Sequence, residues 1–257
     1  MKLLCIGDVM GRPGREKLLQ ALPQLKRETG AEFIIVNGEN ASGGKGLNRR
    51  GMEDLLTAGA DVVTMGNHVW DNKEIFQFID DEPRLVRPAN YPAYCPGKEY
   101  GIYHCGSNER IAVINLCGRV FMPALDCPFA AVDSILEAVQ NEVDYIIVDF
   151  HAEATSEKLA MAYYLDGRVS AVVGTHTHVP TADARILPQG TAYITDLGMT
   201  GVQESVLGIK SELIIHKFLT ARPVKYEIAE GMAKLQGVWI ELDDRSGKSL
   251  SITQINI

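Results

Sequence analysis

Short apolar runs recur along the chain and are separated by polar or glycine-containing segments. Runs of this kind cover residues 2–7, 33–36, 61–65, 145–150 and 169–173. Their length and their content of Val and Ile are typical of buried strands. Leu18, Leu22 and Leu25 recur at helical spacing and predict a helix over residues 15–28. Shorter helices are predicted over residues 52–58, 130–140 and 156–165.

The alternation of strands and helices indicates βαβ units and a mainly parallel arrangement. Beyond Pro83 the pattern changes, and residues 100–105 and 110–116 predict an antiparallel hairpin around the turn at 106–108. Later strand-like runs lie at 184–187, 191–195, 224–229, 233–242 and 250–257. No linker or low-complexity stretch interrupts the chain. We therefore expect one α/β domain over residues 1–257, with two sheets packed face to face between helices.

Charge and composition narrow the function classes. The net charge of −8 argues against a broad surface for duplex nucleic acid, although a bound cation can still attract a small anion. The apolar run at the N-terminus is too short for a signal peptide, and no stretch approaches the roughly 20 apolar residues of a membrane span. We expect a cytoplasmic protein whose five cysteines are free thiols.

Polar residues follow the ends of the predicted strands, which is where open α/β sheets place their ligands. These residues are Asp8, Glu39, Asn40, Asn67, His68, His151, His176 and His178. Taken singly, the amides are ordinary turn residues and a lone histidine is more often a satisfied core residue. Their repeated occurrence at strand ends predicts that one edge of a sheet gathers them. The segment Gly174-Thr175-His176-Thr177-His178 contributes two imidazoles at once.

Carboxylates, amides and imidazoles together form a mixed nitrogen and oxygen ligand set. Such a set suits borderline divalent metals such as iron, manganese or zinc, and differs from the all-oxygen cages of calcium. There are enough donors for two ions, and two ions roughly 3.5 to 4 Å apart can clamp a phosphoryl group. One carboxylate has to bridge such a pair, and Glu39 is the best placed candidate.

The loop over residues 41–50 places three glycines beside Lys45, Arg49 and Arg50. A mobile, cationic loop of this kind is able to close on a phosphate or a nucleotide, which makes Lys45 a candidate substrate-binding residue. The same residues are equally consistent with a solvent-exposed loop whose charges have no role in binding.

Two other functions remain open from the residues alone. Gly7, Gly11 and Gly14 after the first strand, with Glu39 after the second, imitate a dinucleotide-binding fingerprint. The glycine spacing is wrong for that fingerprint, and the motif leaves the strand-end histidines unexplained. A regulatory, non-catalytic metal-binding module is the third possibility.

The strand-end motifs resemble those of the calcineurin-like metallophosphoesterases. The resemblance is closest to their YmdB-like branch, whose members carry stretches similar to residues 7–14, 37–40 and 66–71. Where the broad superfamily has a histidine two residues after the first aspartate, this chain has Met10, and Glu39-Asn40 replaces an aspartate-based bridge. Both departures agree with the YmdB-like branch.

The resemblance implies a four-layer αββα sandwich with a dinuclear metal centre, phosphodiesterase activity that includes 2',3'-cyclic nucleotides, and a homo-oligomer. It implies two ligand sets, one of Asp8, Glu39, Asn40 and His178, and one of Glu39, Asn67, His151 and His176. An activated hydroxide would attack phosphorus while His68, oriented by Asp71, protonates the leaving oxygen. We expect iron or manganese, because nitrogen and oxygen donors outnumber softer ones.

Overall fold

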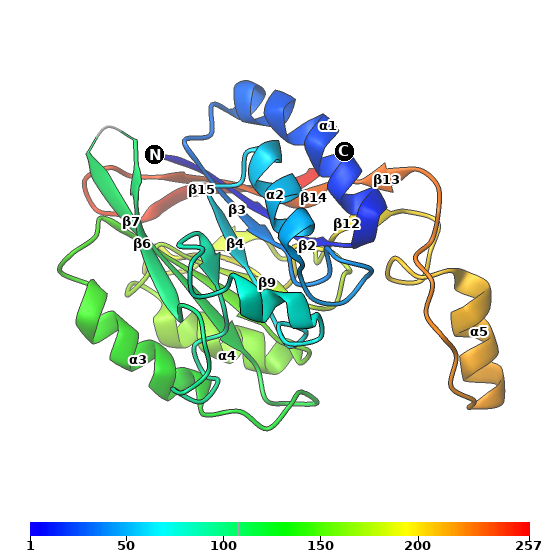
Figure 1. The fold of residues 1–257 in the computed structure, drawn as a ribbon. Coiled ribbons are helices and arrows are strands. Elements are labelled where there is room, and N and C mark those ends of the chain that lie inside the picture. The colour runs from blue at the N-terminus through cyan, green and yellow to red at the C-terminus, as the bar shows by residue number, and fades with distance from the viewer. Residues whose placement is uncertain (107) are drawn as a thin grey trace.

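In the computed structural model, which describes residues 1–106 and 108–257, two six-stranded sheets lie face to face (Figure 1). The first sheet has the strand order β15-β14-β1-β3-β4-β5. Its parallel strands are β1 (Lys2–Ile6), β3 (Phe33–Asn37), β4 (Val62–Thr64) and β5 (Leu85–Val86). The antiparallel strands β14 (Gln236–Leu242) and β15 (Ser249–Asn256) complete one edge.

The second sheet has the strand order β10-β11-β9-β8-β7-β6. Its parallel strands are β7 (Glu109–Cys117), β8 (Tyr145–His151), β9 (Ala171–Thr175) and β11 (Ala192–Ile194). The antiparallel strands β6 (Tyr100–Cys105) and β10 (Arg185–Ile186) form its edges. The pairing of β6 with β7 confirms the predicted hairpin, although residue 107 of the predicted turn lies outside the described residues.

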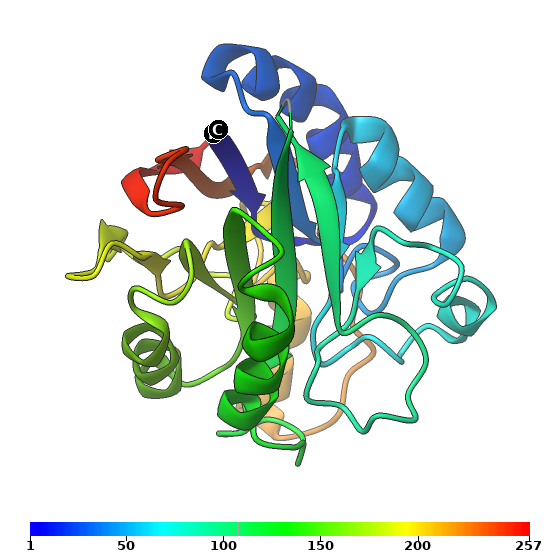
Figure 2. The ribbon, with the colours of Figure 1, turned by 90° about the vertical axis from the view of Figure 1, so that its left-hand side faces the viewer.

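Four helices cover the outer faces of the two sheets. Helices α1 (Gly11–Thr29) and α2 (Arg49–Ala58) pack on the first sheet, and α3 (Pro128–Val139) and α4 (Thr155–Leu165) pack on the second. Figure 2 shows the two pairs on opposite sides of the molecule. Three apolar clusters fill the three spaces between layers, so the four-layer αββα sandwich is confirmed.

Both faces of the central strands are buried, which explains why the sequence reads as continuous apolar runs rather than as an alternating pattern. Side chains on a strand alternate between faces. In β3, Ile34 and Val36 contact the helices, whereas Phe33 and Ile35 lie between the sheets. Towards the carboxyl ends the positions between the sheets become polar. These buried polar positions are Asn37, Thr64, Asp149, His151 and Thr175.

Element boundaries differ from the prediction where local signals were ambiguous. Helix α1 begins at Gly11 rather than at residue 15, because Pro13 falls in the first turn, where backbone N–H groups have no partner within the helix. Helix α2 begins at Arg49, since the Asn48 side chain caps it by accepting a hydrogen bond from Gly51 N at 2.8 Å.

The chain between β11 and β14 contains elements that the sequence pattern did not reveal. A small third sheet joins β2 (Asp8–Val9), β12 (Met199–Val202) and β13 (Ala233–Lys234). The predicted strand over 224–229 is wrong, since within it only Ile228 forms a bridge, to Ile209. Elsewhere in the chain, a short 3-10 helix that was also not predicted covers Lys73–Gln77, between β4 and β5.

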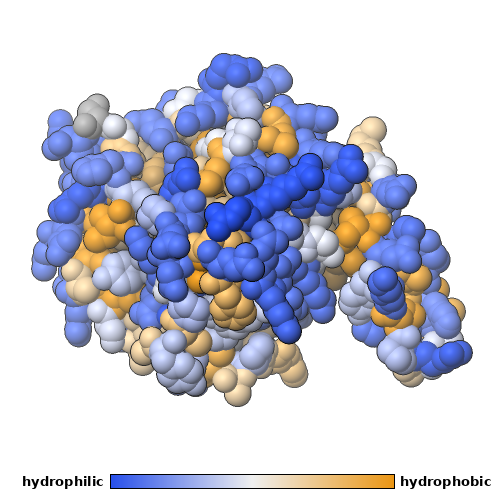
Figure 3. Space-filling model, in the orientation of Figure 1, coloured by the Kyte–Doolittle hydropathy of each residue, from blue (hydrophilic) through white to orange (hydrophobic). Residues whose placement is uncertain are grey.

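Helix α5 (Ser211–Thr220) projects from the body beside the small sheet (Figure 1). Four of its apolar residues, Ile214, Ile215, Phe218 and Leu219, share one side of the helix, but because the helix projects from the body only Ile214 is buried, while Phe218 is 82% exposed. Figure 3 shows the apolar atoms on this projection. Among the described residues, no helix is both long enough and apolar enough to cross a bilayer.

Candidate metal centre

The eight polar residues predicted at strand ends lie together at one end of the space between the sheets. In chain order they are Asp8 in β2, Glu39 and Asn40 after β3, Asn67 and His68 after β4, His151 at the end of β8, and His176 and His178 after β9. The two six-stranded sheets supply all of them except Asp8, which lies in the small third sheet, so the single sheet edge that the sequence suggested is wrong. The contacts described below join donors from both large sheets.

Three polar atoms crowd around one ring nitrogen of His151. Its Nε2 atom lies 3.1 Å from Glu39 Oε1, 3.0 Å from Asn67 Oδ1 and 3.0 Å from His176 Nδ1. A single N–H hydrogen cannot serve three such neighbours. Neighbouring ligands on an ion with bonds of about 2.1 Å stand roughly 3 Å apart. The spacing therefore fits donors that share one cation, and Glu39, His151 and His176 form a candidate metal-binding group.

Asp8 contributes a buried oxygen that has no hydrogen-bond partner. This atom, Oδ1, lies 3.8 Å from His178 Nε2 and 3.9 Å from His151 Nδ1, while Oδ2 accepts a hydrogen bond from His176 N at 3.2 Å. Leaving a buried carboxylate oxygen unpaired is costly. A cation placed between Asp8 and His178 would satisfy it.

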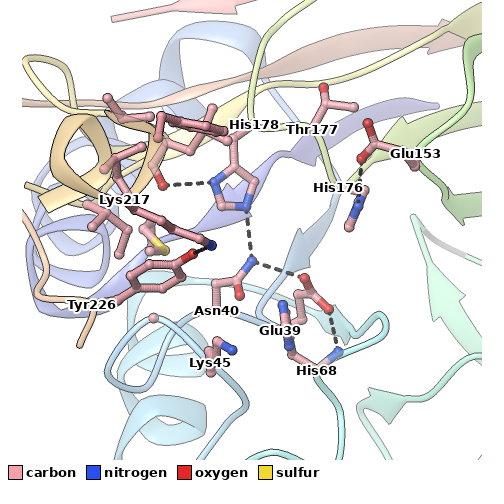
Figure 4. A pocket seen from close by; sticks show the side chains of 17 residues that line it. Glu39, Asn40, Lys45, His68, Glu153, His176, Thr177, His178, Lys217 and Tyr226 are labelled. Carbon is pink, nitrogen blue, oxygen red and sulfur yellow. Dashed lines mark hydrogen bonds and ion pairs between the residues drawn. The ribbon is translucent and has the colours of Figure 1, made fainter. Parts of the chain in front are cut away.

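Asn40 joins the Asp8 half of the site to Glu39. Its Nδ2 atom lies 3.0 Å from His178 Nε2 and 3.0 Å from Glu39 Oε1 (Figure 4). Glu39 Oε1 thus contacts both halves, which is the position that a bridging carboxylate needs. The amide nitrogen of Asn40, not its oxygen, faces the site, and a half-turn of the amide would present the oxygen as a metal ligand.

Two further contacts fix which nitrogens of the imidazoles face the site. His178 Nδ1 donates to Leu207 O at 3.2 Å, which leaves its Nε2 lone pair directed at Asn40. His176 Nε2 donates to Glu153 Oε2 at 3.0 Å, which leaves its Nδ1 lone pair directed at His151. Glu153 was missed in the sequence, although its position two residues after His151 places it near the strand end.

The buried charges of the cluster shift one another's pKa values. Burial raises the pKa of Asp8 to about 6. Burial alone would raise the pKa of Glu39, but the positive charge of His151 and the hydrogen bonds from His151 and His68 hold it at about 2. Burial lowers the pKa of His151, yet Glu39 and Asp8 outweigh burial and raise it to about 9. Burial and His151 lower the pKa of His176 to about 3. Without a metal ion, the raised pKa of His151 favours a proton on this residue at the position where a cation would bind.

The segment that carries His176 and His178 adopts an unusual backbone. Both residues have positive φ angles, 105° and 64°, a region that non-glycine residues rarely occupy. A buried ion pair holds the segment in place. Lys158 Nζ lies 2.7 Å from both Asp196 Oδ2 and Thr175 O, and the same Asp196 oxygen accepts from Thr177 N at 3.0 Å.

His68 and Lys45 line a cavity of about 370 Å³ that opens beside the metal donors (Figure 4). The His68 backbone N–H donates to Glu39 Oε2 at 3.0 Å, which ties its loop to the centre. Residues from the chain between β12 and β13 form the opposite wall. They are Val206, Leu207, Ile209, Ile214, Lys217, Phe218 and Tyr226. The sequence did not indicate this wall, because its residues carry no motif.

Comparisons with known proteins place this geometry in a family. A family model described as YmdB-like protein matches residues 4–255. The chain is 54% identical to the 2',3'-cyclic-nucleotide 2'-phosphodiesterase of Bacillus subtilis (strain 168) over 258 residues, which cover 100% of the chain and 97% of that relative. It is 37% identical to a putative phosphatase/phosphodiesterase of Mycoplasma genitalium, over 100% of the chain and 93% of the relative.

Two solved structures are similar over the whole chain. A hypothetical protein from Thermus thermophilus is 44% identical and superposes with a TM-score of 0.94, covering 100% of this chain and 99% of the other. A novel phosphatase from Mycoplasma pneumoniae is 38% identical, also with a TM-score of 0.94, covering 100% and 93% of the two chains. The match of the family model across nearly the full length, supported by these relatives, shows that the chain belongs to the YmdB-like protein family.

Proposed function

We propose that the protein is a metal-dependent phosphodiesterase that hydrolyses 2',3'-cyclic nucleotides. The observation that carries the proposal is the crowding of Glu39, Asn67 and His176 around His151 Nε2, directly beside a cavity that also contains His68. The name of the Bacillus subtilis relative supports the substrate class.

The donor set favours two divalent ions. One ion would take Asp8, Glu39, Asn40 and His178, and the other would take Glu39, Asn67, His151 and His176. The unpaired Asp8 Oδ1 supports the first set, and the donors around His151 support the second. We favour iron or manganese, because these metals accept mixed imidazole and carboxylate ligands.

The bound ions would polarise the phosphate and supply an activated water as the nucleophile. The protein's own task is to hold the substrate and to move a proton. His68 lines the cavity, and its Nδ1–H is held by Asp71 Oδ2 at 2.9 Å. When both ring nitrogens carry a hydrogen, the proton on Nε2 is the one that can pass to the leaving oxygen, which leaves a neutral imidazole. Lys45 would attract the phosphate from the cavity rim.

The wall formed by the chain between β12 and β13 suits the nucleoside part of the substrate. Ile209, Ile214 and Phe218 supply apolar surface, and Tyr226 adds an aromatic ring with a polar end. Apolar and aromatic surface of this kind can stack on a nucleobase without a fixed pattern of hydrogen bonds, so it can accept more than one base. The cavity therefore offers a metal-binding end for the phosphate and an apolar end for the base.

The test is elemental analysis of protein purified without chelator, followed by turnover of 2',3'-cyclic AMP. We expect up to two equivalents of metal, turnover that chelation abolishes, and a Glu39→Gln variant that loses both metal and activity. Glu53→Gln is the matched control, because Glu53 is an exposed carboxylate on α2 away from the centre. Metal without turnover would indicate a regulatory metal-binding module, and a metal-free, fully active protein would refute the proposal.

A further inference from the structure

The polar residues between the sheets include a carboxylate that is not placed to bind a metal directly. Asp149 lies in β8 two residues before His151, so both side chains point into the space between the sheets. Asp149 is 2% exposed. A carboxylate buried so completely is tolerated only where several donors compensate the lost hydration.

Hydrogen bonds from both sheets supply that compensation. Asp149 Oδ2 accepts from Thr64 Oγ1 at 2.5 Å and from Asn37 Nδ2 at 3.0 Å, and both donors belong to the first sheet. Asp149 Oδ1 accepts from Thr175 Oγ1 at 2.7 Å, within the second sheet. Asp149 therefore connects the two sheets directly beneath the metal centre.

The Thr175 hydroxyl links this carboxylate to His151. The two residues are paired in register on β9 and β8, and Thr175 Oγ1 lies 2.9 Å from His151 Nδ1. A hydroxyl has one hydrogen, and Thr175 directs it at Asp149. Thr175 can then only accept from His151, so the imidazole carries a hydrogen on Nδ1.

A neutral imidazole with a hydrogen on Nδ1 has its lone pair on Nε2. That lone pair points at Glu39, Asn67 and His176, all of which also present acceptors there. The chain of contacts from Asp149 through Thr175 thus sets the tautomer that a metal ligand needs. A carboxylate behind a ligating histidine also makes the imidazole a better donor.

We propose that Asp149 and Thr175 are positioning residues that hold His151 in its metal-binding tautomer and orientation. The inference rests on the proposed metal centre and extends it to a layer of residues that the strand-end motifs do not include. The competing explanation is that Asp149 merely ties the two sheets together, in which case every hydrogen bond to it has the same consequence.

Matched variants separate the two explanations. Thr175→Val removes the hydroxyl that contacts both Asp149 and His151 and keeps the side-chain shape. Thr64→Val removes another hydrogen bond to the same carboxylate, from a residue whose side chain hydrogen-bonds to Asp149 and not to His151. Thr175→Ser restores the hydroxyl and is the rescue variant.

The experiment is calorimetric titration of the metal-free full-length proteins with Mn²⁺, together with their thermal unfolding. Removing a partner behind a ligating histidine typically weakens metal binding by about 10- to 100-fold. We expect Thr175→Val to lose that much affinity at one of the two sites, Thr175→Ser to recover most of it, and Thr64→Val to stay within about threefold of wild type. Both valine variants should unfold at a lower temperature than wild type.

The outcomes are distinct. Wild-type protein that binds neither Mn²⁺ nor Fe²⁺ would contradict the proposed function itself. Wild type that binds Mn²⁺ together with a Thr175→Val variant of equal affinity would overturn this inference alone. Equal affinity losses in Thr175→Val and Thr64→Val would show that Asp149 only ties the sheets together.

A measurement on wild-type protein needs no variant and so does not depend on how a variant folds. In Zn²⁺-loaded protein, nuclear magnetic resonance should detect a slowly exchanging Nδ1–H signal from His151 with a through-space contact to the Thr175 side chain. Rapid exchange of that hydrogen, or a hydrogen on Nε2 instead, would also overturn the inference.

Discussion

The Nδ1 atom of His68 lies 2.9 Å from Oδ2 of Asp71, three residues further along the loop that follows β4. The carboxylate can only accept, so it fixes the hydrogen on Nδ1 and turns Nε2 into the nitrogen available for proton transfer. The pair has the arrangement of a general acid and the residue that orients it.

Replacing His68 with alanine should therefore affect substrates according to their leaving group. General acid catalysis contributes typically 10²- to 10⁴-fold, so kcat for 2',3'-cyclic AMP should fall by about that factor. An ester with a p-nitrophenolate leaving group, which departs without protonation, should lose much less. Equal losses in steady-state assays of the two substrates would remove the acid role from His68.

Lys45 lines the cavity from an exposed position in the loop before α2. Lys45→Ala should raise KM for a cyclic nucleotide a few-fold and leave kcat nearly unchanged. The reason is that an exposed lysine adds at most about 1 kcal/mol to the binding free energy of an anionic substrate. Arg50→Ala is the control, since Arg50 is exposed at the start of α2 and does not line the cavity. Identical KM values for both variants and wild type would mean that the loop is simply solvated.

Lys158 and Asp196 form a buried ion pair, and their side chains are 1% and 0% exposed. Breaking a buried pair leaves one charge uncompensated, which costs about 3–5 kcal/mol. Lys158→Met should lower the free energy of unfolding in urea by that amount, and it should weaken metal binding because Asp196 also holds Thr177 N. Lys210→Met, which breaks an exposed pair with Glu227, should leave the unfolding curve nearly unchanged. A small effect of the Lys158 substitution would show that the pair does not support the histidine segment.

Gly66 offers a way to disturb the centre with a single methyl group. A Cβ atom at this position would overlap Glu39 Oε2 and lie 2.5 Å from His151 Nε2. Gly66→Ala should therefore push two proposed ligands apart and weaken metal binding at least about tenfold. Gly43→Ala, where an added Cβ meets nothing within 4 Å, should bind metal like wild type despite its positive φ. Unchanged affinity in Gly66→Ala, measured by calorimetry, would contradict the ligand geometry.

Asp183 lies away from the centre and provides a test of pH dependence. Burial raises its pKa, but hydrogen bonds from Thr195 and Thr181 outweigh burial and hold the pKa below the usual value of 3.8. Thr195 donates through its backbone N–H at 3.1 Å and its hydroxyl at 2.5 Å. A lowered pKa means that the ionised group stabilises the fold above pH 4 and that this contribution disappears as the pH falls through the folded pKa.

Asp183→Asn should consequently be less stable than wild type at pH 6, and the difference should shrink as the pH falls towards 3. Urea unfolding at a series of pH values checks this expectation. A difference that stays constant with pH would show that the stabilisation does not depend on the charge of Asp183.

The sequence determined the strands of the two sheets, apart from the two-residue strand β5 in a segment that was predicted to be irregular, and it determined the polar positions at the strand ends. Runs such as 33–36 and 145–148 are apolar without alternation because both of their faces are buried, and this property is local to each run. The residues at the strand ends could also be predicted locally, because a change from apolar to polar residues marks the position where a strand leaves the core. Helix α5 was not predicted, although Ile214, Ile215, Phe218 and Leu219 recur at helical spacing, and the sequence does not show that the helix projects from the body with most of this face exposed.

Only the tertiary structure decided how these residues combine. It placed donors from two sheets around His151, joined Asp149 to Asn37 across 112 positions of sequence, and paired Lys158 with Asp196 behind the histidine segment. Hydrophobic periodicity reports how deeply a residue is buried, whereas a hydrogen bond or a shared cation depends on which distant atoms approach within about 3 Å. Which distant atoms meet depends on how one sheet packs on the other, and no local sequence pattern predicts this packing.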